Sequence, residues 1–368
     1  MRKIRVLVVD DSTVIRRLLT DALNADPGVE VAATAPNGRI ALAKIPHINP
    51  DVITLDMEMP EMDGIATLIE LRKKYPKLPV IMFSTLTQRG AEATLDALAK
   101  GANDYVTKPA NVGSVTAALQ NVRMELIPRI KAFCPEFAPT PSTASDPPLI
   151  ARGLPKTIKT TPAKHSRIDI VAIGVSTGGP NALQAVLTKL PADLPVPIVI
   201  VQHMPPIFTK HLADRLHQLS AMNVVEAARG DMIAPGGVWI APGDHHMLLR
   251  RDGNHVRVDT NQEPPENSCR PAVDVLFRSV AQVYGPNVLG VVLTGMGQDG
   301  ARGAAAIRDA GGRVLAQDEA TSVVWGMPGA VVQAGLASAV WPLNQIATEI
   351  VRESEMGRIH SSKELVRA

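Results

Sequence analysis

The sequence predicts a protein of two α/β domains, each built on a doubly wound, mostly parallel sheet, with an antiparallel hairpin in the second. Short apolar, β-branched runs alternate with helix-like segments over residues 1–126 and again from residue 168. This is the pattern of strand–helix–strand units. A proline-rich segment without periodicity separates the two blocks. We therefore expect domains at 1–126 and 168–355, a flexible linker at 127–167 and a tail at 356–368.

The first block is expected to form five strands with helices between and after them. The apolar runs are IRVLVV (4–9), VEVAAT (29–34), DVITL (51–55), PVIMF (79–83) and DYVT (104–107). Helical periodicity is found in VIRRLLTDALN, ATLIELRKKY and AEATLDALAK. Strands and helices that alternate in this way form a parallel sheet with helices on both faces.

The segment that follows is predicted to be an extended linker. Residues 128–167 contain eight prolines and many Ser and Thr residues. Such a segment cannot bury enough apolar surface to offset the entropy of ordering it.

The second block is expected to form a second sheet with one hairpin. Strand-like runs are DIVAIGV (169–175), PIVIVQ (197–202), VVEAA (224–228), VWIA (238–241), VLGVVLT (288–294) and RVLAQ (313–317). Helical segments such as ALQAVLTKL and IFTKHLADRLHQL separate several of them. MLLRRDGNHVRVD carries Asp-Gly-Asn between two runs in which polar and apolar residues alternate. This pattern predicts a β-hairpin appended to the sheet.

The bulk composition excludes several classes of protein. A net charge of +2 and 3% aromatic residues give no basis for binding nucleic acid. Two cysteines cannot form a disulfide framework or a cysteine-rich zinc site, which favours a reducing compartment. The N-terminus lacks the long apolar core of a signal peptide, and no window approaches the ~20 apolar residues of a membrane span. We expect a cytoplasmic monomer without membrane insertion.

Acidic and basic side chains follow the predicted strands of the first block. Asp10 and Asp11 follow the first strand, Asp56 the third, and Lys108 the fifth. In a doubly wound sheet these strand ends share one edge, where three carboxylates would repel unless a hard cation lies among them. Mg²⁺ suits such a site, and a lysine beside a hydroxyl such as Ser84 suits a phosphoryl group.

The motifs VVDDS, TLDMEMPEMDG, FSTLT and DYVTKP resemble the response-regulator receiver domain along all of residues 1–126. The resemblance implies a flavodoxin-like fold and a histidine kinase that phosphorylates the acceptor. The roles that it implies are phosphoacceptor for Asp56, Mg²⁺ ligands for Asp10, Asp11, Asp56 and the backbone carbonyl of Glu58, and switch or phosphate-contacting residues for Ser84, Tyr105 and Lys108.

Three polar residues follow strands of the second block in the same manner. GVSTGGP (174–180) fits G-x-S-x-G, in which a tight strand-to-helix turn exposes the serine, here Ser176. His203 ends the next strand, and Asp299 lies past the strand VLGVVLT. A nucleophile, a base and an orienting acid would converge at one sheet edge. Their order along the chain differs from that of α/β-hydrolases.

The motifs GVSTGGP, VQHMPP, APGDHHM, RPAVDVLF and TGMGQDGARG resemble the catalytic domain of the chemotaxis protein-glutamate methylesterase/protein-glutamine glutaminase (CheB) family. That family also carries an N-terminal receiver, so the resemblance covers nearly the whole chain apart from the linker. It implies hydrolysis of glutamate methyl esters on methyl-accepting chemotaxis receptors, with deamidation of receptor glutamines, and no cofactor for the esterase. Its implied roles are nucleophile for Ser176, base for His203, orienting acid for Asp299 and oxyanion donors near Thr177 and Met296.

Two other functions fit parts of the sequence. Gly295, Gly297 and Gly300 satisfy G-x-G-x-x-G, and Asp318 and Glu319 follow about 18 residues later, close to a dinucleotide-binding fingerprint. A receiver-controlled oxidoreductase would use this loop, but it leaves Ser176 and His203 unexplained. A non-catalytic signalling adaptor is the other alternative. In the favoured interpretation, a methylesterase, the tethered receiver occludes the active site until Asp56 is phosphorylated.

Overall fold

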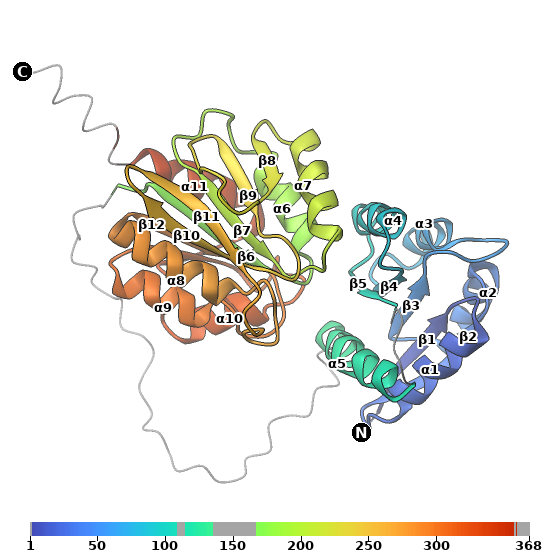
Figure 1. The fold of residues 1–368 in the computed structure, drawn as a ribbon. Helices are drawn as coiled ribbons and strands as arrows, with labels where there is room; N and C mark the ends of the chain where they lie inside the picture. Colours follow the sequence, from blue (N-terminus) through green and yellow to red (C-terminus); the bar gives the residue numbers. More distant parts are fainter. Residues whose placement is uncertain (1, 109–114, 135–166, 357, 359–368) are drawn as a thin grey trace, which may run out of the picture.

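The computed structural model describes residues 2–108, 115–134, 167–356 and 358. Two sheets, each covered by helices on both faces, form separate bodies along the chain (Figure 1). Among the described residues no helix is long and apolar enough to cross a membrane.

The first body is a five-stranded parallel sheet in the order β2-β1-β3-β4-β5. Its strands are β1 (Ile4–Val9), β2 (Val29–Ala35), β3 (Val52–Asp56), β4 (Val80–Ser84) and β5 (Asp104–Thr107). Its helices are α1 (Thr13–Asn24), α2 (Gly38–Ile48), α3 (Gly64–Lys74), α4 (Gln88–Ala99) and α5 (Val115–Phe133). Every residue of β3 and β4 is buried, as expected of central strands covered on both faces.

Side-chain oxygens begin four of these helices. Ser12, Asn37, Asp63 and Thr87 each accept a hydrogen bond from a backbone N–H in the first turn of α1, α2, α3 and α4. Such caps satisfy donors that a helix leaves free at its start. They also fix where each loop at the carboxyl edge of the sheet ends.

The second body is a seven-stranded parallel sheet in the order β14-β13-β12-β6-β7-β9-β8. Its strands are β6 (Ile170–Val175), β7 (Ile198–Gln202), β8 (Asn223–Glu226), β9 (Gly237–Ile240), β12 (Val288–Val292), β13 (Arg313–Gln317) and β14 (Ala339–Trp341). Its helices are α6 (Gly179–Leu187), α7 (Phe208–Leu219), α8 (Val273–Tyr284), α9 (Ala301–Asp309), α10 (Gly326–Gln333) and α11 (Leu343–Glu355), with a 3-10 turn at Gly285–Asn287.

The strand order of this sheet reverses at β6, which lies between β7 and β12. The chain first builds the sheet from β6 toward β8 and later adds β12 on the other side of β6, and such a switch point opens a crevice at the carboxyl ends of these three strands. This is the edge at which the sequence predicts Ser176, His203 and Asp299.

The hairpin differs from the prediction in one respect. Strands β10 (His246–Asp252) and β11 (His255–Asn261) pair antiparallel around Gly253, but they form a separate two-stranded sheet. β10 packs against α8 instead of extending the seven-stranded sheet. The buried side chains of Met247, Leu249 and Val258 join the core on that face of the molecule.

The predicted linker begins too early. Helix α5 continues through Pro128 to Phe133, so residues 127–133 are helical. Buried Leu126 and Ile130 belong to the core of the first body, which extends this helix beyond the predicted boundary. Residues 135–166 of the predicted linker and most of the predicted tail lie outside the described residues.

Candidate active site and receiver pocket

Three carboxylates converge at the carboxyl edge of the first sheet. Asp10 and Asp11 are the two residues after β1, and Asp56 is the last residue of β3. One ligand oxygen from each lies within 4.8 Å of the others. Lys108, which follows β5, places Nζ 2.7 Å from Oδ2 of Asp56 and 3.0 Å from Oδ2 of Asp10.

Burial makes Asp56 unusually basic for a carboxylate. Desolvation is the largest influence and raises its pKa, and the charge of Asp10 raises it further. The hydrogen bond and charge of Lys108 oppose this, and the resulting pKa of Asp56 is about 6. Charge in this pocket is therefore only partly compensated by the lysine.

The residues present fit a magnesium ion. Three converging carboxylates are hard oxygen donors, and one lysine does not balance their charge. Asp10, Asp11 and Asp56 would hold the ion. Glu58, whose N–H lies 3.5 Å from Oδ1 of Asp56, lines the same cavity of about 610 Å³.

The predicted switch residues point in different directions. Ser84 is buried, and its hydroxyl donates to the carbonyl of Gly90 at 3.2 Å. Tyr105 stacks on Phe208 of α7, with ring centroids 5.0 Å apart and planes 5° from parallel. Tyr105 therefore contacts the second body, not the carboxylate pocket.

Ser176 lies in the turn between β6 and α6. Its N–H donates to the carbonyl of Thr294 at 3.0 Å, which ties the turn to the segment after β12. Gly178 begins α6 with φ +77°, a conformation that a side chain disfavours. A Cβ on Gly295 would lie 2.8 Å from Cβ of Ser176, so glycine lets the two loops touch.

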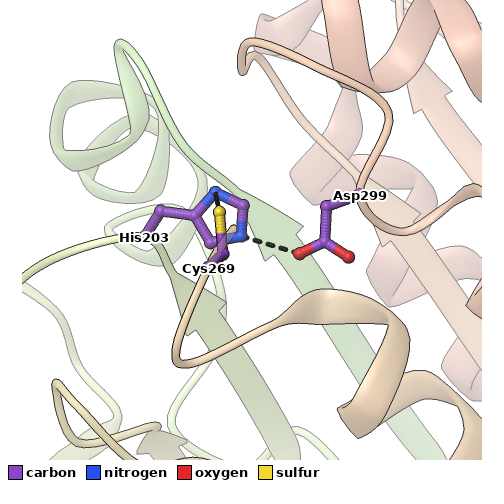
Figure 2. Close-up of side chains that lie close together, drawn as sticks. All are labelled: His203, Cys269 and Asp299. Atoms are coloured by element: carbon purple, nitrogen blue, oxygen red, sulfur yellow. Dashed lines mark hydrogen bonds and ion pairs between the residues drawn. The ribbon is translucent and has the colours of Figure 1, made fainter. Parts of the chain in front are cut away.

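His203 follows β7 and is held from both sides. Its Nε2 lies 2.8 Å from Oδ2 of Asp299, and its Nδ1 lies 3.5 Å from Sγ of Cys269 (Figure 2). Ser176 and His203 line one cavity of about 610 Å³, together with Thr177 and Met296. Among the described residues, no hydrogen bond joins His203 to the hydroxyl of Ser176.

The carboxylate of Asp299 is buried and saturated with hydrogen bonds. Oδ2 accepts from the N–H of Val273 at 2.7 Å in addition to His203. Oδ1 accepts from the N–H of Asp274 at 3.0 Å and from the side-chain amide of Asn267 at 2.7 Å. The start of α8 thus supplies donors that favour a negative charge at this position.

The pKa values of the pair move apart. Burial would raise the pKa of Asp299, but the hydrogen bond and charge of His203 outweigh it and lower the pKa. Burial would likewise lower the pKa of His203, yet hydrogen bonds to Asp299 and then to Cys269 raise it to about 10. The pair is therefore strongly coupled, with Asp299 charged.

Three residues of this site were not predicted as site residues. Asn267 and Cys269 lie in the loop before α8, and Asp274 lies in its first turn. The motif RPAVDVLF (270–277) contains Asp274 but not Asn267 or Cys269, and no strand ends in this segment, so the strand-end argument could not find the three residues.

The glycine-rich loop after β12 does not present a free phosphate site. Gly300 begins α9, and the N–H groups of Gly300 and Gly303 donate to Oδ1 of Asp274 at 3.0 and 2.6 Å. A dinucleotide pyrophosphate would need those same donors. The carboxylate of Asp318 instead accepts from the N–H of Thr321 at 3.0 Å.

Residues of the first body complete the cavity around Ser176. Asp104 accepts a hydrogen bond from the hydroxyl of Thr177 at 3.0 Å and pairs with Arg129 at 3.1 Å. Met124 and Arg129 of α5 line the same cavity as His203. Helix α4 packs on α6 and α7, where Asp96 lies 2.6 Å from Arg215.

Comparisons with known proteins agree with this architecture. Residues 171–350 match the CheB methylesterase family, and residues 6–120 match the response regulator receiver domain. A protein-glutamate methylesterase/protein-glutamine glutaminase of Trichodesmium erythraeum is 55% identical over 96% of this chain and 99% of its own. One from a Nocardioides species is 54% identical over 96% of both chains.

A solved structure matches the second body. The CheB methylesterase catalytic domain of Thermotoga maritima is 43% identical, with a TM-score of 0.50, and covers 51% of this chain and 99% of its own. Similarity that spans both domains and nearly the full length of the relatives leads to one conclusion: this chain belongs to the CheB methylesterase family, with a response regulator receiver domain at its N-terminus.

Proposed function

We propose that this chain hydrolyses glutamate methyl esters on methyl-accepting chemotaxis receptors, and deamidates receptor glutamines, through an acyl-enzyme on Ser176. The observation that carries the proposal is that Ser176 and His203 line one cavity while Asp299 holds Nε2 of His203 at 2.8 Å. The similarity to enzymes named protein-glutamate methylesterase/protein-glutamine glutaminase supports the substrate.

In the proposed reaction His203 acts through Nδ1. Because Asp299 engages Nε2, Nδ1 is the nitrogen left to take the proton of Ser176. Only the neutral imidazole can accept that proton, and with the pKa of His203 raised to about 10 its population grows as the pH rises. The alkoxide attacks the ester carbonyl, and methanol leaves from the tetrahedral intermediate. Water then hydrolyses the glutamyl-enzyme, so the ester cleavage balances without a cofactor. Backbone N–H groups near Thr177 and Met296 are the proposed oxyanion donors.

The proposed control is by phosphorylation of Asp56 from a histidine kinase. Mg²⁺ held by Asp10, Asp11 and Asp56 would neutralise charge on the incoming phosphoryl group. Support for inhibition by the receiver comes from Asp104, Met124 and Arg129, which line the same cavity as Ser176. Opening a mostly closed population requires about 3–5 kcal/mol of differential stability. We place the reaction in the cytoplasm of a cell, because two cysteines cannot form a disulfide framework and so favour a reducing compartment.

The test is methanol release from methylated receptors by the full chain, with and without a small phosphodonor. Ser176→Ala should lower the rate on the order of 10⁴-fold or more, as loss of a triad nucleophile does. Ser220→Ala, on the far end of α7, is the matched control and should keep the rate. Near-normal turnover by Ser176→Ala would refute the proposal.

A further inference from the structure

A cysteine that the proposed reaction does not use lies against its base. Sγ of Cys269 is 3.5 Å from Nδ1 of His203 (Figure 2), and both residues line the cavity. His203, Cys269 and Asp299 present nitrogen, sulfur and oxygen atoms within 4.8 Å of one another. Nitrogen and sulfur together are the donors that zinc and related transition metals prefer over magnesium.

The spacing of the two atoms suits a shared tetrahedral metal. Zinc binds sulfur at about 2.3 Å and imidazole nitrogen at about 2.0–2.1 Å, so at a tetrahedral angle the two ligand atoms lie about 3.5–3.6 Å apart. The separation between Sγ of Cys269 and Nδ1 of His203 is 3.5 Å. The pair therefore needs little movement to hold such an ion.

Asp299 prepares the imidazole for this role. Histidines that bind metals commonly donate their second ring N–H to a carboxylate, which fixes the ring and the tautomer. Asp299 occupies that position at Nε2, at 2.8 Å, and leaves Nδ1 facing Cys269. The same contact that orients the proposed base thus presents its other nitrogen to a metal.

The loop that carries Cys269 is also fixed. Its N–H donates to the carbonyl of Glu266 at 2.9 Å, and the N–H of Glu266 donates back to the carbonyl of Cys269 at 3.1 Å. Arg278 of α8 binds both carboxylate oxygens of Glu266 at 2.8 and 2.6 Å. Metal binding would not have to order this loop.

We propose that Cys269 and His203 form an inhibitory site for Zn²⁺ or a similar thiophilic divalent ion. The ion bridges Sγ and Nδ1, the thiol proton and the proton that the imidazolium carries on Nδ1 leave to solvent, and the remaining coordination positions open to the cavity that Ser176 lines. The bound ion occupies the nitrogen that would accept the proton of Ser176, so it stops the esterase. The proposal that the metal binds depends on the geometry alone, whereas the proposal that it inhibits the esterase rests on the proposed function.

The experiment uses the metal-free full chain, with Mg²⁺ in excess to fill the carboxylates of the receiver. Co²⁺ is added as a spectroscopic probe, because a thiolate ligand gives a charge-transfer band in the near ultraviolet that oxygen ligands do not. The chain has two cysteines, so Cys134→Ser is the matched control for Cys269→Ser. Zn²⁺ inhibition of methanol release is measured on the same proteins, and circular dichroism checks that each is folded.

We expect the cobalt–thiolate band in the wild type, in Cys134→Ser and in Ser176→Ala, and its loss in Cys269→Ser. Half-inhibition by Zn²⁺ should need about 100-fold more metal in Cys269→Ser than in the wild type. Removing only a residue that hydrogen-bonds a metal ligand already lowers metal affinity by about 10- to 100-fold. If Cys269→Ser does not fold, Cys269→Ala replaces it.

The two halves of the proposal fail separately. A band that survives in Cys269→Ser, or that never forms in the wild type, overturns the metal site. A band that forms while Zn²⁺ leaves turnover unchanged overturns the inhibition. Because Ser176→Ala reports binding without catalysis, a chain that proves to have no esterase activity refutes the proposed function and leaves the metal site to be judged by the band.

Discussion

The carboxylate of Asp299 is the most heavily constrained group of the candidate site. The N–H groups of Val273 and Asp274 and the amide of Asn267 all donate to it, and it in turn fixes His203. Asp299→Asn keeps the size of the side chain but removes its charge. We expect turnover to fall on the order of 10⁴-fold and the pKa of His203 to fall from about 10, because hydrogen bonding to Asp299 is the first influence that raises it.

Methanol release and an NMR titration of ¹⁵N-labelled histidine measure these two effects. Asp318→Asn is the control, since Asp318 is the acid that a dinucleotide site would need and it caps a turn at Thr321. Loss of turnover in Asp318→Asn with normal turnover in Asp299→Asn would reverse the assignment.

At Asp56 the prediction concerns pH. Burial raises the pKa of this carboxyl to about 6 despite Lys108. Above that pH the group is an anion that can bind Mg²⁺, and below it a proton competes with the ion. The affinity for Mg²⁺ at pH 5 should therefore be about tenfold weaker than at pH 7.5, one pKa unit being a factor of ten.

Calorimetric titration of Mg²⁺ at several pH values measures this competition. Asp56→Asn should bind the ion more weakly and lose most of the pH dependence. An affinity of the wild type that is constant from pH 5 to pH 7.5 would contradict the raised pKa.

The three proposed catalytic residues could be predicted from the sequence because each follows a buried strand. Parallel strands bring their carboxyl ends to one edge, which led us to expect Ser176, His203 and Asp299 together. In the structure β6 lies between β7 and β12, so the three residues follow neighbouring strands. Cys269 could not be found in this way. It lies in the loop between β11 and α8, several residues past the end of β11 in the sequence, and only the folding of this loop brings it beside His203.

At the scale of elements, the predicted strands agree with the structure within one or two residues, but β14 (Ala339–Trp341) was not predicted. The environment of the predicted strands was predicted less well. Period-two alternation in MLLRRDGNHVRVD identifies a hairpin, but not what its apolar face packs against. The structure places that face on α8. Likewise the prolines marked a linker, yet Pro128 sits inside α5, where the burial of Leu126 and Ile130 continues the helix.

The contact between the loops after β6 and β12 gives a prediction for Gly295. A Cβ there would lie 2.8 Å from Cβ of Ser176 and close to the sulfur of Met327. Gly295→Ala should lower the free energy of unfolding by about 1–3 kcal/mol, as overpacking does, and should displace Ser176 and lower turnover. Thermal denaturation and methanol release measure the two.

Gly28→Ala is the control for this substitution. A Cβ at Gly28 would meet the carboxylate of Asp26 at 3.3 Å, in the first body and away from Ser176. It should leave turnover unchanged. If Gly295→Ala matched it in both stability and turnover, close approach of the two loops would not be a requirement of the site.

At the scale of the whole molecule, side-chain contacts join the two bodies. Tyr105 stacks on Phe208, Thr177 donates to Asp104, and Asp96 pairs with Arg215 at 2.6 Å. None of these contacts follows from either domain's sequence pattern, because each pattern reports only the core of its own sheet. They are the structural basis for proposing that the receiver restrains the enzyme.

The ion pair between Asp96 and Arg215 offers a reversible test of that restraint. Both side chains are partly exposed, so the pair contributes roughly 0.2–1 kcal/mol to docking. Asp96→Arg replaces attraction with repulsion and should raise the basal rate of methanol release by about two- to fivefold, given that small energy. The rate after treatment with a phosphodonor should change less, because in the proposed control phosphorylation already opens the protein.

The control is the exchanged pair, Asp96→Arg with Arg215→Asp. It restores opposite charges at the same two positions and should return the basal rate toward that of the wild type, as a double-mutant cycle requires of a direct interaction. If Asp96→Arg leaves the basal rate unchanged, the contact of α4 with α7 does not restrain the enzyme. If the exchanged pair stays as active as the single variant, the effect of Asp96→Arg arises within the receiver and not at the contact between the two bodies.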